Sequence, residues 1–154
     1  MSLACDATDL VGGRGSADGS PPPTCLIVED QALIGLALEA YLEEIGLATC
    51  EAFSSGAKAL EWLASNTPTV AILDYALKDG PCTTLTGVLA QRGIPFVIYS
   101  GHERRIAPPE LQALPWINKP CDREALLAAL TRAAPALAAL HGATTEGRQS
   151  PGRP

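Results

Sequence analysis

Five polar side chains stand directly after short apolar runs, and their types suit chemistry on a charged group. They are Glu29 and Asp30 after CLIV, Asp74 after VAIL, Ser100 after IPFVIY and Lys119 after PWIN. Each alone has an ordinary explanation as a helix cap, a turn residue or a solvated charge. If the apolar runs are parallel strands, however, their carboxyl ends lie on one edge of a sheet. We therefore expect the five side chains to converge there.

The chemistry of such a cluster follows from its charges. Three carboxylates brought together repel one another and either take up protons or bind a cation. An all-oxygen donor set without His or Cys favours a hard ion, and Mg²⁺ fits best. Asp74 is then a candidate nucleophile that forms an aspartyl phosphate, with Lys119 neutralising the transferring group and Ser100 donating to one of its oxygens. The pattern predicts phosphoryl transfer.

The segments that must position these residues alternate between strands and helices. Strands are predicted at 25–28, 47–52, 70–73, 94–99 and 115–118, with the weakest pattern at 47–52 and with 70–73 and 94–99 apolar enough to be buried. Helices are predicted at 31–45, from Ser54 or Ser55 through AKALEWLA, at about 83–91, and from a cap at Asp122 to about Pro135. Only a short helix fits 110–113, because Pro108-Pro109 interrupt that stretch. The alternation predicts right-handed βαβ units, and hence one three-layer α/β domain with a five-stranded parallel sheet.

Length and composition predict one soluble domain with disordered ends. The chain has 154 residues, is 47% hydrophobic and carries a formal net charge of −6, which argues against a nucleic-acid footprint. Its five cysteines form no CxxC pair, which argues against a zinc or dithiol site. We expect a disordered leader at 1–23, a folded domain at 24–140 and a disordered tail at 141–154. No signal segment and no apolar stretch of about 20 residues is visible, so a cytoplasmic location away from membranes is expected.

Four short motifs resemble the receiver domains of two-component response regulators. They are VED at 28–30, LD at 73–74, SG at 100–101 and NKP at 118–120, and their order, spacing and strand placement all agree. The resemblance covers about residues 24–133. It implies a flavodoxin-like sheet of order 2-1-3-4-5. It also implies that a histidine kinase or histidine phosphotransfer protein donates phosphate to this chain, and that Mg²⁺ is required.

The resemblance assigns the metal ligands and the phosphoacceptor. Asp74 matches the acceptor, and Glu29 and Asp30 match the metal-binding acidic pair, with Glu in the first place where Asp is commoner. The backbone carbonyl of Ala76 matches a further metal ligand. Ala76 and His102 flank the site in this family and are expected to tune hydrolysis of the phosphate.

The resemblance also assigns the residues of the switch. Ser100 matches the position that contacts the phosphoryl group and moves on activation. Lys119 matches the family's invariant lysine, and Pro120 the proline that follows it after a cis bond. Trp116 falls on the switch aromatic, normally Tyr or Phe, although an ordinary place in the core would explain it equally well.

Two departures from the family pattern concern the loops. The loop after Asp74 reaches its glycine by Gly80 and lacks the usual proline. The segment between Ser100 and Lys119 is short, with Pro108-Pro109 where the fourth helix is expected. The acceptor chemistry is unaffected. The face formed by the fourth helix, fifth strand and fifth helix, which many receivers use to dimerise or bind targets, is put in doubt.

The sequence therefore predicts a stand-alone receiver that catalyses only its own phosphorylation and dephosphorylation and signals through protein contacts, with a downstream protein target and a possible homodimer. The tail is too short for a helix-turn-helix, so DNA binding is not expected. One alternative is a degenerate receiver that binds partners without phosphorylation. Another is a phosphatase or phosphotransferase of the haloacid dehalogenase type, although that class needs a second Asp where this chain has Ala76.

Overall fold

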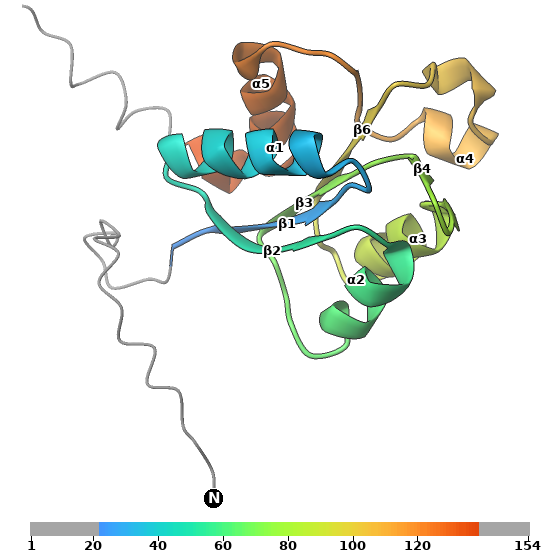
Figure 1. Ribbon diagram of the computed structural model, residues 1–154, viewed down its shortest axis with the longest axis horizontal. Helices are drawn as coiled ribbons and strands as arrows, with labels where there is room; N and C mark the ends of the chain where they lie inside the picture. The colour runs from blue at the N-terminus through green and yellow to red at the C-terminus, as the bar shows by residue number, and fades with distance from the viewer. Residues whose placement is uncertain (1–21, 139–154) are drawn as a thin grey trace, which may run out of the picture.

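The computed structural model describes residues 22–138, which form a five-stranded parallel sheet with helices on both faces (Figure 1). The strand order is β2-β1-β3-β6-β7, so the predicted flavodoxin-like order is confirmed. The strands are β1 (Thr24–Val28), β2 (Ala48–Phe53), β3 (Val70–Leu73), β6 (Phe96–Ser100) and β7 (Trp116–Asn118). Apart from Pro22 and Pro23, the predicted disordered leader and tail lie outside the described residues, and they stay predictions.

The helices pair off on the two faces of the sheet. In Figure 1, α1 and α5 lie on one side, and α2 and α3 lie on the other. They are α1 (Ala32–Glu44), α2 (Gly56–Leu63), α3 (Thr83–Gln91) and α5 (Arg123–Ala133). The predicted short fourth helix is α4 (Pro109–Gln112), which follows a 3₁₀ turn, Arg104–Ile106. None of the helices formed by residues 22–138 has the length and apolar character that crossing a bilayer requires.

Strand alternation divides the apolar core into two halves. Along β1, Cys25 and Ile27 belong to the cluster packed under α1 and α5, whereas Leu26 and Val28 belong to the cluster under α2 and α3. All four are at most 1% exposed. Burying the Leu, Ile or Val side chain of such a strand stabilises the fold by about 1.5–3 kcal/mol. Burial on both faces is why the central strands are uninterrupted apolar runs rather than alternating ones.

The predicted helix boundaries rest on caps that the structure contains. Ser55 accepts a hydrogen bond from the backbone N–H of Lys58 (3.2 Å), and Asp122 accepts one from the backbone N–H of Ala125 (2.7 Å). Helix α5 ends at Ala133, two residues before Pro135, because the residue preceding a proline is disfavoured in the helical region. Both predicted caps and the predicted stop are confirmed.

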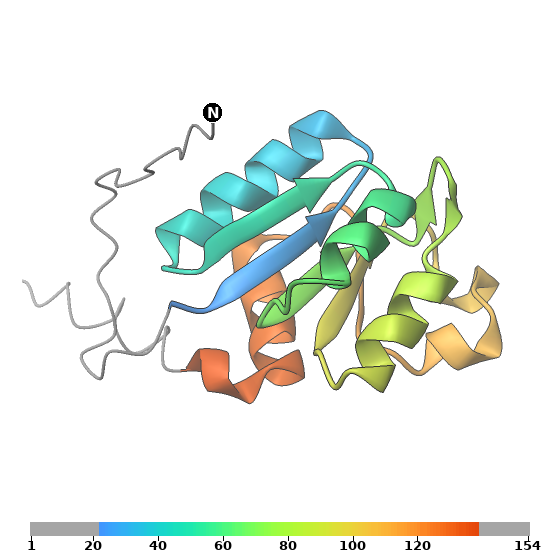
Figure 2. The same ribbon diagram turned by 90° about the horizontal axis from the view of Figure 1, so that it is seen from below.

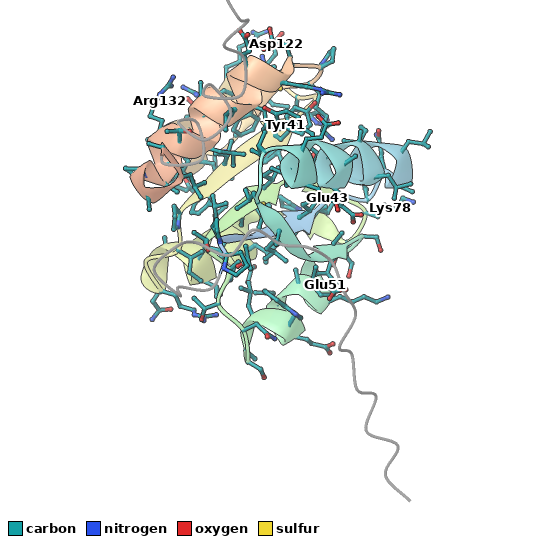
Figure 3. The ribbon with its side chains drawn as sticks, turned by 90° about the vertical axis from the view of Figure 1, so that its left-hand side faces the viewer. Tyr41, Glu43, Glu51, Lys78, Asp122 and Arg132 are labelled. Atoms are coloured by element: carbon teal, nitrogen blue, oxygen red, sulfur yellow. The ribbon has the colours of Figure 1, made fainter. Side chains whose placement is uncertain are left out.

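Polar contacts tie α1 to α5 across the top of one face. The Tyr41 hydroxyl donates to the backbone carbonyl of Arg123 (2.7 Å), and the Arg123 guanidinium pairs with Glu44 (2.7 Å). Figure 3 shows Tyr41 between the two helices. Desolvation at this place between the two helices raises the pKa of the Tyr41 hydroxyl. The two elements that cover this face are thus fixed relative to each other.

The turn after β3 contains a hairpin that the sequence did not predict. Strand β4 (Ala76–Leu77) pairs antiparallel with β5 (Gly80–Pro81), and Gly80 has a φ of +122°, which only glycine adopts without strain. The Asp79 carboxylate accepts hydrogen bonds from the backbone N–H groups of Gly56 (3.2 Å) and Ala57 (3.1 Å). Figure 2 shows the hairpin beyond the carboxyl ends of the strands. The loop is therefore attached to the N-terminus of α2.

Candidate functional site

The carboxyl edge of the sheet brings three predicted acids together. Glu29 directly follows β1, and its N–H donates to the carbonyl of Phe53; Asp74 directly follows β3, and its N–H donates to the carbonyl of Val28 (2.8 Å). Carboxylate oxygens of Glu29, Asp30 and Asp74 all lie within 4.8 Å of one another. Sheet hydrogen bonds thus hold the backbones of two of the acids, and Asp30 follows at the start of the turn into α1.

Lys119 places a single ammonium between two of these acids. Its Nζ forms an ion pair with Glu29 and lies 3.2 Å from Oδ2 of Asp74. The side chains are 12% exposed for Lys119, 2% for Glu29 and 7% for Asp74, so little water screens these charges. The lysine backbone N–H donates to the carbonyl of Ser100 (2.8 Å), and its bond to Pro120 is cis. The end of β7 therefore delivers the ammonium into the acidic cluster.

Burial and charge shift the titration of this pair in ways that keep the ammonium charged. Desolvation raises the pKa of Glu29, and the hydrogen bond from Lys119 only partly offsets it. Desolvation alone would lower the pKa of Lys119, but the hydrogen bond to Glu29 and the charge of Asp74 outweigh it and raise that pKa. Three carboxylates face one ammonium, so two formal negative charges are left over. The oxygen donors and this excess fit a divalent cation, and the cluster could hold one.

Ser100 ends β6 on the same edge but does not hydrogen bond with the acids. It is fully buried, and its Oγ accepts the backbone N–H of His102 (3.1 Å). Nδ1 of the His102 ring lies 3.5 Å from the same oxygen. Within residues 22–138, only His102 hydrogen bonds with this hydroxyl. Of the five side chains expected to converge, four are in one cluster, and Ser100 stands on the neighbouring strand beside it.

The first residues of the loop after β3 turn back toward the acceptor candidate. The backbone N–H of Ala76 donates to Oδ1 of Asp74 (3.3 Å), the local turn that Asp side chains commonly stabilise. The ligand role of the Ala76 carbonyl stays a prediction. This turn fixes one carboxylate oxygen against the loop, while Lys119 contacts the other.

Three aromatic rings border the site, and one of them escaped the sequence analysis. The Tyr75 ring, one residue after Asp74, lies 5.3 Å from the Trp116 ring and 6.0 Å from the His102 ring, centroid to centroid. Trp116 is only half-buried, and its Nε1 donates to Oδ1 of Asn118 (3.0 Å). An aromatic residue directly after a strand-end acid was the available signal for Tyr75. These contacts connect the loop after β3 with the residues that follow β6 and with the first residue of β7.

Comparison with known proteins agrees with the fold and with the motifs. The model of the response regulator receiver domain matches residues 25–131. The DNA-binding transcriptional regulator NtrC of Escherichia coli is 31% identical over 112 residues, which cover 70% of this chain and 24% of that protein. This chain thus spans about a quarter of the length of the curated relatives it matches.

Solved structures give the same picture. A sensor protein from Polaromonas sp. JS666 superimposes with a TM-score of 0.67 at 28% identity, covering 76% of this chain and 99% of that one. SdrG from Sphingomonas melonis superimposes with a TM-score of 0.62 at 30% identity, covering 76% and 97%. With the family model matching more than half of its length, the chain belongs to the response regulator receiver domain family, whose members act in phosphorylation-controlled signalling.

Proposed function

We propose that this chain is a phosphorylation-controlled switch of a two-component or phosphorelay system, in which Asp74 accepts a phosphoryl group from a histidine kinase or histidine phosphotransfer protein. One observation carries the proposal: a largely buried ammonium, Lys119, contacts two of three clustered carboxylates, Glu29 and Asp74. Taking these charged groups out of water lowers the stability of the fold, so a purely structural role does not explain why they are clustered. With a divalent cation bound to the carboxylates, the same arrangement would suit a site that receives a dianionic group.

Glu29, Asp30 and Asp74, with the backbone carbonyl of Ala76, would hold Mg²⁺. When bound, the ion would supply positive charge against the oxygens of the transferring group. The excess negative charge of the cluster and its all-oxygen donors support this assignment.

In the transfer step, a carboxylate oxygen of Asp74 forms a bond to phosphorus as the P–N bond of the donor's phosphohistidine breaks. The electron pair of that bond returns to the imidazole nitrogen, which a proton then neutralises. Lys119 holds its ammonium beside Asp74, where the new negative charge arrives. The Ser100 oxygen accepts the backbone N–H of His102, and its O–H would turn from the 3.5 Å contact with Nδ1 of His102 to donate to a phosphoryl oxygen.

The signal is a change in protein contacts. A phosphate on Asp74 adds a charge of roughly −1.5 to −2 and three strong acceptors, which draw in Lys119 and Ser100 and shift a two-state equilibrium. A downstream protein, or a second copy meeting the face of α4, β7 and α5, would read that shift. We further propose that the chain acts on no other substrate. We also propose that it works in the cytoplasm.

The test is incubation with acetyl phosphate or phosphoramidate and Mg²⁺, followed by intact mass. We expect a phosphoryl adduct of about 80 Da on the wild type, and none on Asp74→Asn or in EDTA. A second donor, a phosphorylated histidine phosphotransfer domain, guards against poor use of small donors. A folded protein that takes phosphate from neither donor would be a binding module, and steady turnover of unrelated phosphomonoesters would indicate a phosphatase.

A further inference from the structure

The β4-β5 hairpin that follows the proposed acceptor is too small to hold its own shape. Each of its strands is two residues long, and even a longer hairpin with only two strands is marginally stable in water. At the base of the hairpin, the backbone N–H of Cys82 donates to the carbonyl of Tyr75 (3.0 Å), and the Leu77 side chain is buried in the core under α2 and α3. The position of the tip must come from a contact outside the hairpin.

Asp79 provides that contact by fastening the tip to α2. One carboxylate oxygen accepts the N–H of Gly56 (3.2 Å), and the other accepts the N–H of Ala57 (3.1 Å). These bonds lower the pKa of Asp79, so its carboxylate is charged at neutral pH and faces the positive end of the helix dipole. Within residues 22–138, no other hydrogen bond joins the hairpin to α2.

Close packing does not hold the tip in place. A cavity of about 190 Å³ lies between the hairpin, α2 and α3, and its lining includes Leu60, Leu77, Pro81 and Thr84 as well as Asp79. Across such a gap the facing side chains make few van der Waals contacts. The position of the tip relative to α2 therefore depends on the two hydrogen bonds of Asp79.

The other end of the hairpin belongs to the acidic cluster. The N–H of Ala76 donates to Oδ1 of Asp74 (3.3 Å), and its carbonyl is the proposed backbone ligand of Mg²⁺. Ala76 and Asp79 are three positions apart, at most about 10 Å of extended chain, so a shift of the tip is transmitted to Ala76. A carbonyl ligand has no side-chain rotamer to adjust, and its position is that of the loop.

We propose that Asp79 is a positioning residue of the metal site. By fastening the hairpin to α2, it holds the Ala76 backbone where its N–H meets Asp74 and its carbonyl faces the ion. Groups that orient a metal ligand contribute to metal affinity without touching the metal. The inference rests on the proposed function, since it requires the site to bind Mg²⁺.

The test compares Asp79→Ala with Ser55→Ala in a titration with Mg²⁺ alone, followed by amide chemical shifts. Ser55→Ala is the matched control, because it removes a hydrogen bond from the same end of α2 but leaves the hairpin attached. We expect the dissociation constant for Mg²⁺ to rise about tenfold in Asp79→Ala, the lower end of what losing an orienting group costs. It should stay at the wild-type value in Ser55→Ala. Asp79→Asn, which keeps one acceptor oxygen, should lie between them.

Hydrogen exchange shows whether the hairpin itself has loosened. The Cys82 amide, which closes the base of the hairpin on Tyr75, should exchange faster in Asp79→Ala and at the wild-type rate in Ser55→Ala. Equal Mg²⁺ dissociation constants in the two variants would overturn the inference and leave the proposed function standing. If Asp79→Ala does not fold, the comparison of Asp79→Asn with Ser55→Ala decides in the same way. A wild type that binds no Mg²⁺ would overturn both.

Discussion

At the scale of single residues, one ammonium group, that of Lys119, forms ion pairs with two carboxylates. Lys119 contacts Glu29 and Asp74, and the raised pKa of Lys119 keeps the ammonium charged well above neutral pH. Breaking a buried pair by removing one partner strands the other charge away from water. The lysine therefore has a structural role in the resting state besides its proposed role toward phosphate.

These two ion pairs predict how the free energy of unfolding changes in Lys119→Met, measured in EDTA at neutral pH. We expect it to be less stable than the wild type by about 3 kcal/mol, because the buried carboxylates lose their cation. Urea unfolding measures the difference. Restoring most of the stability in Glu29→Gln/Lys119→Met would locate the cost at Glu29, and an equal loss in the single and double variants would contradict that explanation.

The pH dependence of the same variants has a definite sign. A carboxyl group whose folded pKa is raised, as burial does for Glu29, contributes stability below its unfolded pKa and loses it as pH rises through the folded value. Without Lys119 the raised pKa goes higher still. Lys119→Met should therefore recover stability relative to the wild type as pH falls from neutral toward the pKa of a free glutamate. The double variant should not.

At the scale of elements, the N-terminus of α2 is capped from two directions. The Ser55 hydroxyl, directly before the helix, accepts a hydrogen bond from the N–H of Lys58. The Asp79 carboxylate, in the β4-β5 hairpin, accepts hydrogen bonds from the N–H groups of Gly56 and Ala57. A helix leaves its first N–H groups without partners, and a carboxylate there also meets the positive end of the helix dipole. The hairpin after the proposed acceptor is thus attached to a second element.

We expect Asp79→Ala to lower the melting temperature and to speed hydrogen exchange at the Gly56 and Ala57 amides, with Asp79→Asn in between. The two backbone hydrogen bonds lower the pKa of Asp79 from its ordinary 3.8. Its contribution is therefore present above that value and lost as pH falls through the folded pKa. The difference between wild type and Asp79→Ala should shrink in acid. Unchanged exchange at both amides would contradict the cap.

The features that the sequence did not predict are those with no clear pattern of apolar and polar residues. Continuous apolar runs predicted the central strands, because a strand that is buried on both faces does not alternate between apolar and polar residues. The β4-β5 hairpin has strands of two residues, too short for any period, and Asp79-Gly80 indicated only a break. The contact of Lys119 with Glu29, 90 positions apart, followed from strand ends sharing an edge. The Tyr75 contacts depend on side-chain packing, which spacing does not specify.

At the scale of the whole molecule, the rings of Tyr75 and Trp116 connect the acidic cluster with the face of β7. Tyr75 follows Asp74, and Trp116 lines a cavity of about 260 Å³ together with Ala129 and Ala133 of α5. A displacement of the loop on phosphorylation would move one ring against the other. The fluorescence emission of the Trp116 indole would therefore report that movement.

In a Trp62→Phe background, we expect the emission of Trp116 to change when acetyl phosphate and Mg²⁺ are added. Tyr75→Leu should still gain the phosphoryl mass but show a much smaller emission change, because the ring contact is lost. Lys119→Ala should likewise accept phosphate without the full change. An emission change of equal size in Tyr75→Leu and its parent would rule out Tyr75 as the link between Asp74 and Trp116.

Strand β7 has a further consequence for the molecule in a crowded solution. It lies at one edge of the sheet and is three residues long, with Pro115 before it and Lys119-Pro120 after it. An open edge is a template on which other chains add strands, and short strands, prolines and lysines are what prevent that growth. This edge of the sheet is thus protected from fibril-like stacking. Any chain that met this face would have to recognise it by its side chains rather than by extending the sheet.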